Sequence, residues 1–210
     1  MRKVCIKTLV LGPLQANCYI VRGSETKEVV VIDPGDQVDK IEDYLKENGL
    51  ECKRILLTHG HFDHISAAEE LSNLTKAKIC VFEKESKFLI DPNLNLSTFA
   101  GGGRLSFEAD CSLEDKEEFN EAGLSWQVIH TPGHTEGGVC YLLKDEGVLF
   151  SGDTLFYESV GRSDFPSGNH RTLAESINNR LMILDDSIEV YTGHGRPTTI
   201  GHERQHNPYL

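Results

Sequence analysis

Four side chains that can bind metal ions lie within six residues of the chain. They follow the pattern His59-x-His61-x-Asp63-His64, which comes directly after a short apolar stretch at 54–57. Imidazole nitrogens and carboxylate oxygens are ligands that borderline metals such as zinc and iron accept. Because the side chains of a strand alternate between its two faces, a loop that turns from a strand into a helix is better suited to direct all four around two centres. The pattern therefore indicates a metal site.

Three more side chains of the same kinds stand at the ends of predicted strands. His134, Asp153 and His194 each directly follow a glycine, so the chain can turn sharply there and direct the side chain into a shared cleft. A structural zinc site has four protein ligands, usually including cysteine, and no open coordination position. Seven nitrogen and oxygen ligands without cysteine instead indicate two metals with open coordination positions, which suggests catalysis. The other histidines are interpreted as surface or core residues: His130, His170, His202 and His206.

Composition limits the classes of protein to which the chain can belong. Of the 210 residues, 39% are hydrophobic and 26% are charged, which is typical of a soluble globular protein. Lys and Arg number 21 against 33 Asp and Glu, a net charge of −12. We therefore expect no nucleic-acid partner and no membrane partner, because anionic surfaces would repel the chain. No apolar run reaches the roughly 18 residues that a membrane-spanning helix needs. The oligomeric state is left open.

The cysteines and the amino-terminal segment favour a cytoplasmic protein. Lys7 interrupts the first apolar run and Gly12-Pro13 ends it, so we expect a first strand there rather than a secretory signal. No two cysteines form a C-x-x-C pair, and their wide spacing predicts reduced, mostly buried thiols. They are Cys5, Cys18, Cys52, Cys80, Cys111 and Cys140.

Apolar patterning predicts a single α/β domain over residues 1–210. Helices are expected from Val38 to a stop at Gly49, directly after the His59–His64 pattern, and over 173–184. Residues 91–125 are polar and acidic and contain three consecutive glycines at 101–103, so we predict a surface insertion or a lid there. Strands are expected over 4–11, 17–22, 28–32, 54–57, 78–82, 126–130, 138–143, 148–150 and 188–191.

With these motifs the sequence resembles the metallo-β-lactamase superfamily over essentially its whole length. The resemblance implies an α/β fold, a four-layer αβ/βα sandwich in which two mixed β-sheets are flanked by helices and the metals lie between the sheets. It implies two divalent metal ions as cofactors, zinc first, with iron or manganese as alternatives. It also implies ligand roles: His59, His61 and His134 for the first metal, Asp63, His64 and His194 for the second, and Asp153 bridging both.

Within the superfamily the sequence is most similar to the glyoxalase II-like group, particularly its short bacterial members. Asp33-Pro34-Gly35 and the segments 151–156, 161–166 and 193–195 carry this similarity. The bridging Asp153 argues against a true β-lactamase, whose zinc sites commonly use a cysteine. The nuclease branch carries a large extra domain and a basic surface, neither of which we expect in this acidic chain. The flavodiiron branch appends a flavin domain, for which 210 residues leave no room. Sixteen residues follow His194, where full-length glyoxalase II has a helical domain that contacts glutathione, so the thiol carrier stays open.

This resemblance predicts an enzyme that hydrolyses a small-molecule thioester such as S-lactoylglutathione. A hydroxide that bridges the two metals would attack the thioester carbonyl. Asp63 would be the catalytic residue, orienting the nucleophile and receiving its proton. A persulfide dioxygenase with one iron, held by His59, His134 and Asp153, is an alternative. A lactonase and a metal-binding module without turnover are two others.

Three further residues are candidates, each with an alternative. Asp33 would orient a ligand histidine through the ring nitrogen that does not face the metal; otherwise it is a turn residue before Pro34. Arg162 and Asp164 would contact the substrate, since an arginine suits a carboxylate or phosphate of the thiol carrier. Otherwise the two form an ion pair that braces their loop.

Overall fold

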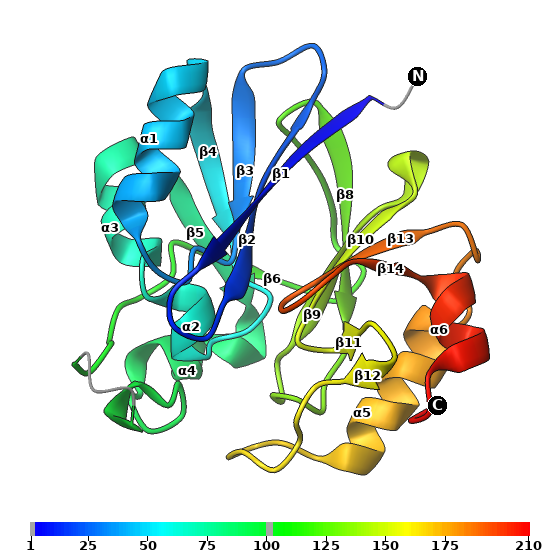
Figure 1. Ribbon diagram of the computed structural model, residues 1–210. Coiled ribbons are helices and arrows are strands. Elements are labelled where there is room, and N and C mark those ends of the chain that lie inside the picture. The colour runs from blue at the N-terminus through cyan, green and yellow to red at the C-terminus, as the bar shows by residue number, and fades with distance from the viewer. Residues whose placement is uncertain (1–2, 100–102) are drawn as a thin grey trace.

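Two β-sheets that face each other form the centre of the structure (Figure 1). The computed structural model describes residues 3–99 and 103–210. Helices cover the outer face of each sheet, so that the layers run helix, sheet, sheet, helix. The predicted four-layer αβ/βα sandwich with two mixed sheets is therefore confirmed.

The strands of the first sheet follow one another in chain order. They are β1 (Val4–Leu11), β2 (Ala16–Gly23), β3 (Glu28–Ile32), β4 (Glu51–Leu56), β5 (Lys78–Phe82) and β6 (Cys111–Leu113). β1, β2 and β3 pair antiparallel, whereas β3 to β6 pair in parallel. β3 and β5 are almost unbroken apolar runs, because helices cover one face of the sheet and the second sheet covers the other.

The second sheet is also mixed. In spatial order its strands are β14 (Thr198–Thr199), β13 (Glu189–Thr192), β10 (Val148–Gly152), β9 (Val139–Leu143), β8 (Leu124–His130) and β7 (Glu118–Glu121). Only β10 and β13 pair in parallel; the other neighbours are antiparallel. A separate hairpin follows β10 and consists of β11 (Leu155–Phe156) and β12 (Ser159–Val160).

Four helices form the outer layers. α1 (Val38–Asn48) and α3 (Ala68–Thr75) lie outside the first sheet, and α5 (His170–Ser176) and α6 (Ile200–His206) lie outside the second (Figure 1). α1 ends where predicted, at Gly49, whose φ of 59° lets its N–H reach the last helical carbonyls. The shorter helices are α2 (Phe62–Ile65), α4 (Ser86–Ile90), the 3-10 turns η1 (Glu83–Glu85), η2 (Ser97–Phe99) and η3 (Lys144–Glu146), and the π-helical η4 (Ile177–Leu181), which continues α5.

Three apolar clusters match the three contacts between the four layers. One joins α1 and α3 to the first sheet and includes Ile41 and Leu71. The central cluster contains side chains of both sheets, such as Ile32 from β3 and Trp126 from β8. The third joins α5 and η4 to the second sheet through Leu173 and its neighbours. Both sheets are thereby held face to face, and loops at one end of each can meet.

The structure corrects the helix predicted after the His59–His64 pattern. Instead of one helix, α2 and α3 are separated at Ser66 and Ala67. The N–H of Ala67 donates to the carbonyl oxygen of Pro34 at 3.0 Å. Ala67 therefore bonds to another loop instead of continuing α2, and α3 begins at the next residue. Ile65, Ala68 and Leu71 still share the buried face that the pattern predicted.

The predicted insertion or lid over 91–125 is wrong for its second half. Residues 111–113 form β6, an edge strand of the first sheet, and residues 118–121 form β7, an edge strand of the second. Their polar composition is explained by that position, because an edge strand faces solvent on one side. Residues 100–102 of the predicted lid, including Gly101 and Gly102, lie outside the described residues.

The prediction of reduced thiols is wrong for one pair of cysteines. Cys80 of β5 and Cys111 of β6 lie opposite each other in the parallel register and form a disulfide. The sequence could not indicate this pairing, because 31 residues separate the two and only the sheet brings them together. Cys18, Cys52 and Cys140 are free and buried, as expected, and Cys5 is free and half-buried.

Among the described residues, no helix is long and apolar enough to cross a membrane.

Candidate metal centre

The loop after β4 supplies four of the candidate ligands. His59 and His61 lie in the loop itself, and Asp63 and His64 lie in the first turn of α2. Gly35 from a neighbouring loop packs directly against this turn, where a Cβ would lie 1.7 Å from the carbonyl oxygen of Asp63. A glycine at position 35 is therefore needed for the turn to occupy its place.

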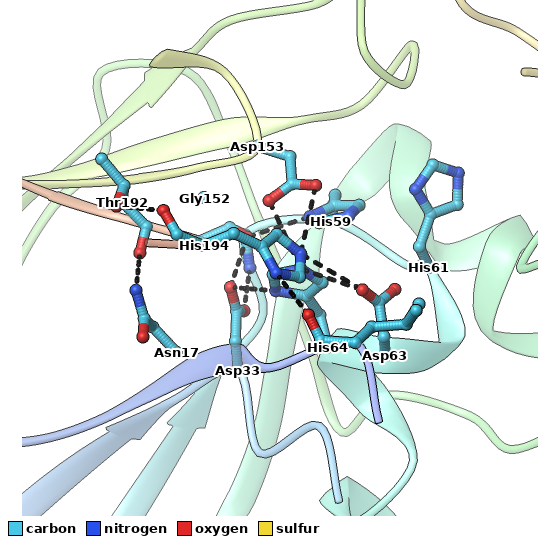
Figure 2. Close-up of polar contacts among 12 residues, drawn as sticks. Asn17, Asp33, His59, His61, Asp63, His64, Gly152, Asp153, Thr192 and His194 are labelled. Carbon is cyan, nitrogen blue, oxygen red and sulfur yellow. Dashed lines mark hydrogen bonds and ion pairs between the residues drawn. The ribbon is translucent and has the colours of Figure 1, made fainter. Parts of the chain in front are cut away.

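The second sheet supplies the other three candidate ligands from the ends of three strands. His134 follows β8, Asp153 follows β10 and His194 follows β13. Gly193 touches the carboxylate of Asp153, since a Cβ there would lie 2.1 Å from its Oδ1. The loops of both sheets meet at one edge of the sandwich and bring the seven side chains together. Figure 2 labels all of them except His134.

One group of ligand atoms comes from His59, His61 and His134. The three offer nitrogens that all lie within 4.8 Å of one another. Nδ1 of His61 is 2.9 Å from Nε2 of His134. Two nitrogens bound to one tetrahedral zinc ion lie about 3.3 Å apart, given zinc–nitrogen bonds of about 2.0–2.1 Å. The spacing of these rings is thus close to that of two ligands of one ion.

A second group comes from Asp63, His64 and His194, which also offer ligand atoms within 4.8 Å of one another. Nε2 of His194 is 3.2 Å from Oδ2 of Asp63 and 3.2 Å from Nε2 of His64. Figure 2 shows these side chains directed toward one another.

Asp153 lies between the two groups. Its Oδ2 is 3.6 Å from Nε2 of His134 in the first group and 3.7 Å from Nε2 of His194 in the second. Its Oδ1 is 3.4 Å from Nε2 of His64. One carboxylate therefore faces nitrogens of both groups.

Four of the five histidines are oriented through Nδ1, the nitrogen that points away from the cluster. His64 donates to Oδ2 of Asp33 at 3.0 Å, His134 to the carbonyl oxygen of Arg162 at 2.6 Å, and His194 to that of Leu14 at 3.1 Å. In each case Nε2 is left facing the other ligands, which is the usual arrangement around a protein-bound metal.

His59 is oriented in the same way through Thr58. The Thr58 hydroxyl donates its proton to Oδ2 of Asp33 at 2.6 Å, so Nδ1 of His59, 3.1 Å away, must donate to the hydroxyl oxygen. Asp33 also accepts from the N–H of Thr58 at 2.7 Å. Since these partners occupy its oxygens, Asp33 is placed to orient His59 and His64 rather than to bind a metal.

Burial and charge set the protonation of the cluster. Burial lowers the pKa of His59 well below its usual range and that of His61 to about 3, so both rings are neutral, the form that binds metals. Burial alone would raise the pKa of Asp153, but the neighbouring imidazoles, His64 foremost, hold it well below its usual value. His64 has a raised pKa: burial opposes its charge, but the carboxylates of Asp153 and Asp63 outweigh that effect.

The residues present fit divalent cations. Nε2 of His59 and Oδ1 of Asp153 are buried and have no hydrogen-bond partner among the described residues, which is rare and unfavourable unless another group satisfies them. The cluster also gathers the carboxylates of Asp33, Asp63 and Asp153 close to the rings of His59 and His61, which are neutral. Cations bound here would compensate this buried negative charge.

Arg162 and Asp164 lie outside the ligand cluster. Both are exposed, and the guanidinium donates to both oxygens of Asp164, at 3.0 and 2.8 Å. Arg162 also lines a cavity of about 450 Å³ beside the ligands, whose other walls are mostly apolar. The ion pair and the substrate contact that the sequence left as alternatives are therefore both compatible with its position.

Sequence reasoning missed three residues that support the cluster. Thr58 joins Asp33 to His59, as described above. Phe165 packs between the ring of His61, at 5.5 Å, and the guanidinium of Arg162, at 4.2 Å. Glu85 accepts hydrogen bonds from both ligand loops. Glu85 could have been identified from its position shortly after β5, because metal ligands and the residues that support them gather at strand ends.

Comparison with a model of the Metallo-beta-lactamase superfamily gives a match over residues 11–194. This range includes all seven candidate ligands and both sheets, except for all but the last residue of β1 and the whole of β14.

Two curated relatives match the chain over nearly their whole length. The chain is 36% identical to "Probable metallo-hydrolase YqgX" of Bacillus subtilis, over 97% of its own length and 96% of the relative. It is 34% identical to "Hydroxyacylglutathione hydrolase GloC" of Haemophilus influenzae over 98% of the chain and 97% of the relative.

Two solved structures have the same fold. One, described as BLEG-1 B3 metallo-beta-lactamase, superposes with a TM-score of 0.93 at 39% identity, over 98% of the chain and 99% of that structure. The other is TTHA1623 in a di-iron-bound form, with a TM-score of 0.85 at 34% identity, over 97% of the chain and 100% of that structure.

Proposed function

The chain belongs to the metallo-β-lactamase superfamily, and from this premise we propose that it is a binuclear metallohydrolase that cleaves a small-molecule thioester. The observation that carries the proposal is the position of Asp153, whose carboxylate faces nitrogens of both ligand groups. A carboxylate placed in this way suits two ions held close together better than it suits one. The similarity to a structure in a di-iron-bound form supports a site for two metals.

The proposed ligand roles follow the two groups. His59, His61 and His134 hold the first metal, and Asp63, His64 and His194 hold the second. Asp153 bridges the two. Zinc is our first choice, and iron and manganese accept the same nitrogen and oxygen ligands.

Metal ions in such a site lower the pKa of a bound water to near 7 and polarise the oxygen of a carbonyl. The chain's own part is to hold and direct the reactants. Asp63 has a lowered pKa: burial would raise it, but His64 and His194 outweigh burial. It is therefore ionised, and its carboxylate can orient the attacking water by accepting a hydrogen bond from it and can then receive its proton.

The cavity beside the ligands suits an apolar part of a thioester. It measures about 450 Å³, and its walls include Leu14, Leu96, Phe156, Val160 and Phe165. Apolar walls exclude water from the reacting carbonyl and strengthen the electrostatic interactions around it. We propose that the acyl group or the first atoms of the thiol carrier pack against these side chains.

Arg162 is our candidate for recognition of the carrier. It is the only Lys or Arg among the described residues that line this cavity. Its pair with Asp164 is exposed, and exposed ion pairs are weak. A carboxylate of the carrier can therefore replace Asp164 as its partner. Glutathione carries such carboxylates, and the similarity to a relative named hydroxyacylglutathione hydrolase favours it.

Hydrolysis of a β-lactam ring is a second candidate. From the sequence we expect no β-lactamase activity, because the zinc sites of those enzymes commonly use a cysteine and lack a bridging aspartate such as Asp153. The similarity to a structure described as a B3 metallo-beta-lactamase, at 39% identity over nearly the whole chain, weakens that expectation. An amide in a strained ring needs the same water activation and oxyanion stabilisation as a thioester.

The first experiment measures metal content and activity on one protein sample. Elemental analysis gives the metals per chain. Hydrolysis is followed with S-lactoylglutathione, with the S-lactoyl thioester of N-acetylcysteamine, with a chromogenic cephalosporin and with a lactone. Oxygen uptake with glutathione persulfide tests the dioxygenase alternative.

We expect about two metals per chain and faster turnover of the thioesters than of the cephalosporin or lactone. Faster turnover of the glutathione thioester than of the N-acetylcysteamine thioester would support glutathione as carrier. One iron per chain with oxygen uptake and no hydrolysis would overturn the proposal, as would hydrolysis of the cephalosporin alone.

A further inference from the structure

Glu85 is a buried carboxylate that belongs to neither ligand group. It ends η1, three residues after β5, and its side chain is fully buried. Its Oε1 accepts a hydrogen bond from the N–H of Gly60 at 2.8 Å, and its Oε2 accepts one from the hydroxyl of Thr135 at 3.0 Å. The N–H of Gly137 also donates to it.

These donors come from two loops on different sheets. Gly60 lies between His59 and His61, in the loop after β4 of the first sheet. Thr135 directly follows His134, in the loop after β8 of the second sheet. One carboxylate thus joins the loop that carries His59 and His61 to the loop that carries His134.

The segment of Glu85 and Phe88 packs closely against both ligand loops. A Cβ on Gly137 would lie 2.5 Å from Oε2 of Glu85, and a Cβ on Gly60 would lie 2.4 Å from the Cβ of Phe88, in the helix after Glu85. Only glycine lets both backbones approach. Near the outer end of the second loop, Lys87 and Glu136 form an ion pair that also joins it to the Glu85 segment.

Among the described residues, no Lys, Arg or His pairs with Glu85, and burial raises its pKa to about 7. A buried carboxylate without a cation opposes folding in its ionised form. Its three donors each favour the ionised form and together fix both loops. An apolar side chain could fill the same volume, but it could not satisfy these donors.

We propose that Glu85 is a positioning residue that sets the distance between the His59–His61 loop and His134, and thereby the affinity of the first metal position. This inference rests on the proposed metal site. Residues that hold metal ligands in place typically change metal affinity about 10–100-fold when they are substituted.

Glu85→Gln is the test variant, because it keeps the shape but turns one acceptor oxygen into a donor that faces Gly137 or Gly60. Glu203→Gln is the matched control. Glu203 is equally buried and accepts hydrogen bonds from the hydroxyl of Thr198, the N–H of Glu158 and the side chain of Asn207, but it touches neither ligand loop.

Zinc binding to the metal-free proteins is measured by competition with a chromophoric chelator, and the visible spectrum of the Co²⁺-loaded proteins reports ligand geometry. We expect two binding steps in the parent and in Glu203→Gln. In Glu85→Gln we expect one step to weaken about 10–100-fold and the Co²⁺ spectrum to change. Melting temperatures of the metal-free variants measure the structural effect separately.

Equal zinc affinities in Glu85→Gln and the parent would overturn the inference and leave the proposed function standing. A parent that binds no zinc or Co²⁺ would overturn the proposed function itself. If Glu85→Gln does not fold, Thr135→Val decides, because it removes one donor with little change of shape. It should weaken the same step to a smaller degree, and an unchanged step would contradict the inference.

Discussion

Asp153 is held in place through both its backbone and its side chain. A Cβ on Gly161 would lie 1.7 Å from its carbonyl oxygen, and a Cβ on Gly193 would lie 2.1 Å from its Oδ1. The carboxylate faces His64 and His134 of the two ligand groups. Neighbours without side chains thus allow one carboxylate to reach both proposed metals.

Asp153→Asn should lose at least one metal and most of the hydrolytic activity while the protein stays folded. The amide keeps the shape of the side chain but removes the charge and one of the two oxygens that bridging needs. Metal analysis and thioester turnover, with circular dichroism to monitor folding, check this.

Asp110→Asn is the control, because Asp110 is exposed and accepts from the N–H of Ile79 at 2.8 Å, away from the ligands. Parental turnover and metal content in Asp153→Asn would show that the bridging role is wrong.

At the scale of elements, the edge strands β6 and β7 are held differently. β7 joins β8 through a short hairpin at 121–124. β6 has three residues and joins β5 in parallel after a long connection. The disulfide between Cys80 and Cys111 fastens this short strand to the sheet. The predicted cytoplasmic location relied on reduced thiols, so that part of its support is lost.

Cys111→Ser should lower the free energy of unfolding by about 3.5–4 kcal/mol. A cross-link across 31 residues removes conformational entropy from the unfolded chain by about this amount. Urea denaturation without reductant measures the loss, and reduced parent protein should match the variant.

Cys5→Ser, at a free and half-buried cysteine, should unfold like the parent. Titration of the unreduced, denatured parent should find four thiols. Six thiols would mean that no disulfide forms and that the original prediction was right.

At the scale of the whole molecule, the proposed metals lie between two sheets that contribute ligands separately. The first sheet supplies His59, His61, Asp63 and His64, and the second supplies the rest. The central apolar cluster already holds the sheets together. Metals bound at their common edge would add a second connection, present only in the folded state.

Removal of the metals should therefore lower the melting temperature. A ligand present at 100 times its dissociation constant stabilises the folded state by about 2.7 kcal/mol. In a chain of this size each kcal/mol corresponds to about 2–4 °C, so a decrease of about 5–11 °C is expected.

Calorimetry with and without a chelator measures the change. Asp153→Asn serves as control, since a variant short of metal should respond less. An equal melting temperature with and without chelator would contradict metal binding in the folded state.

Much of the fold could be predicted because its signals are local. The bounds of β1, β3 and β5 agree with the predicted ones, since apolar runs and the glycines and prolines that end them act within a few residues. The stop of α1 at Gly49 has the same origin. The seven candidate ligands could be named because each lies in a short motif at a strand end.

The tertiary structure decided which distant segments meet. Asp33 reaches His64, the carbonyl of Leu14 reaches His194, and Glu85 joins two loops across the sheets. Residues 111–113 and 118–121 form edge strands because each pairs with a strand of its sheet. Periodicity and turn residues report the preferences of a single segment, whereas these contacts depend on packing between segments that lie far apart in the chain.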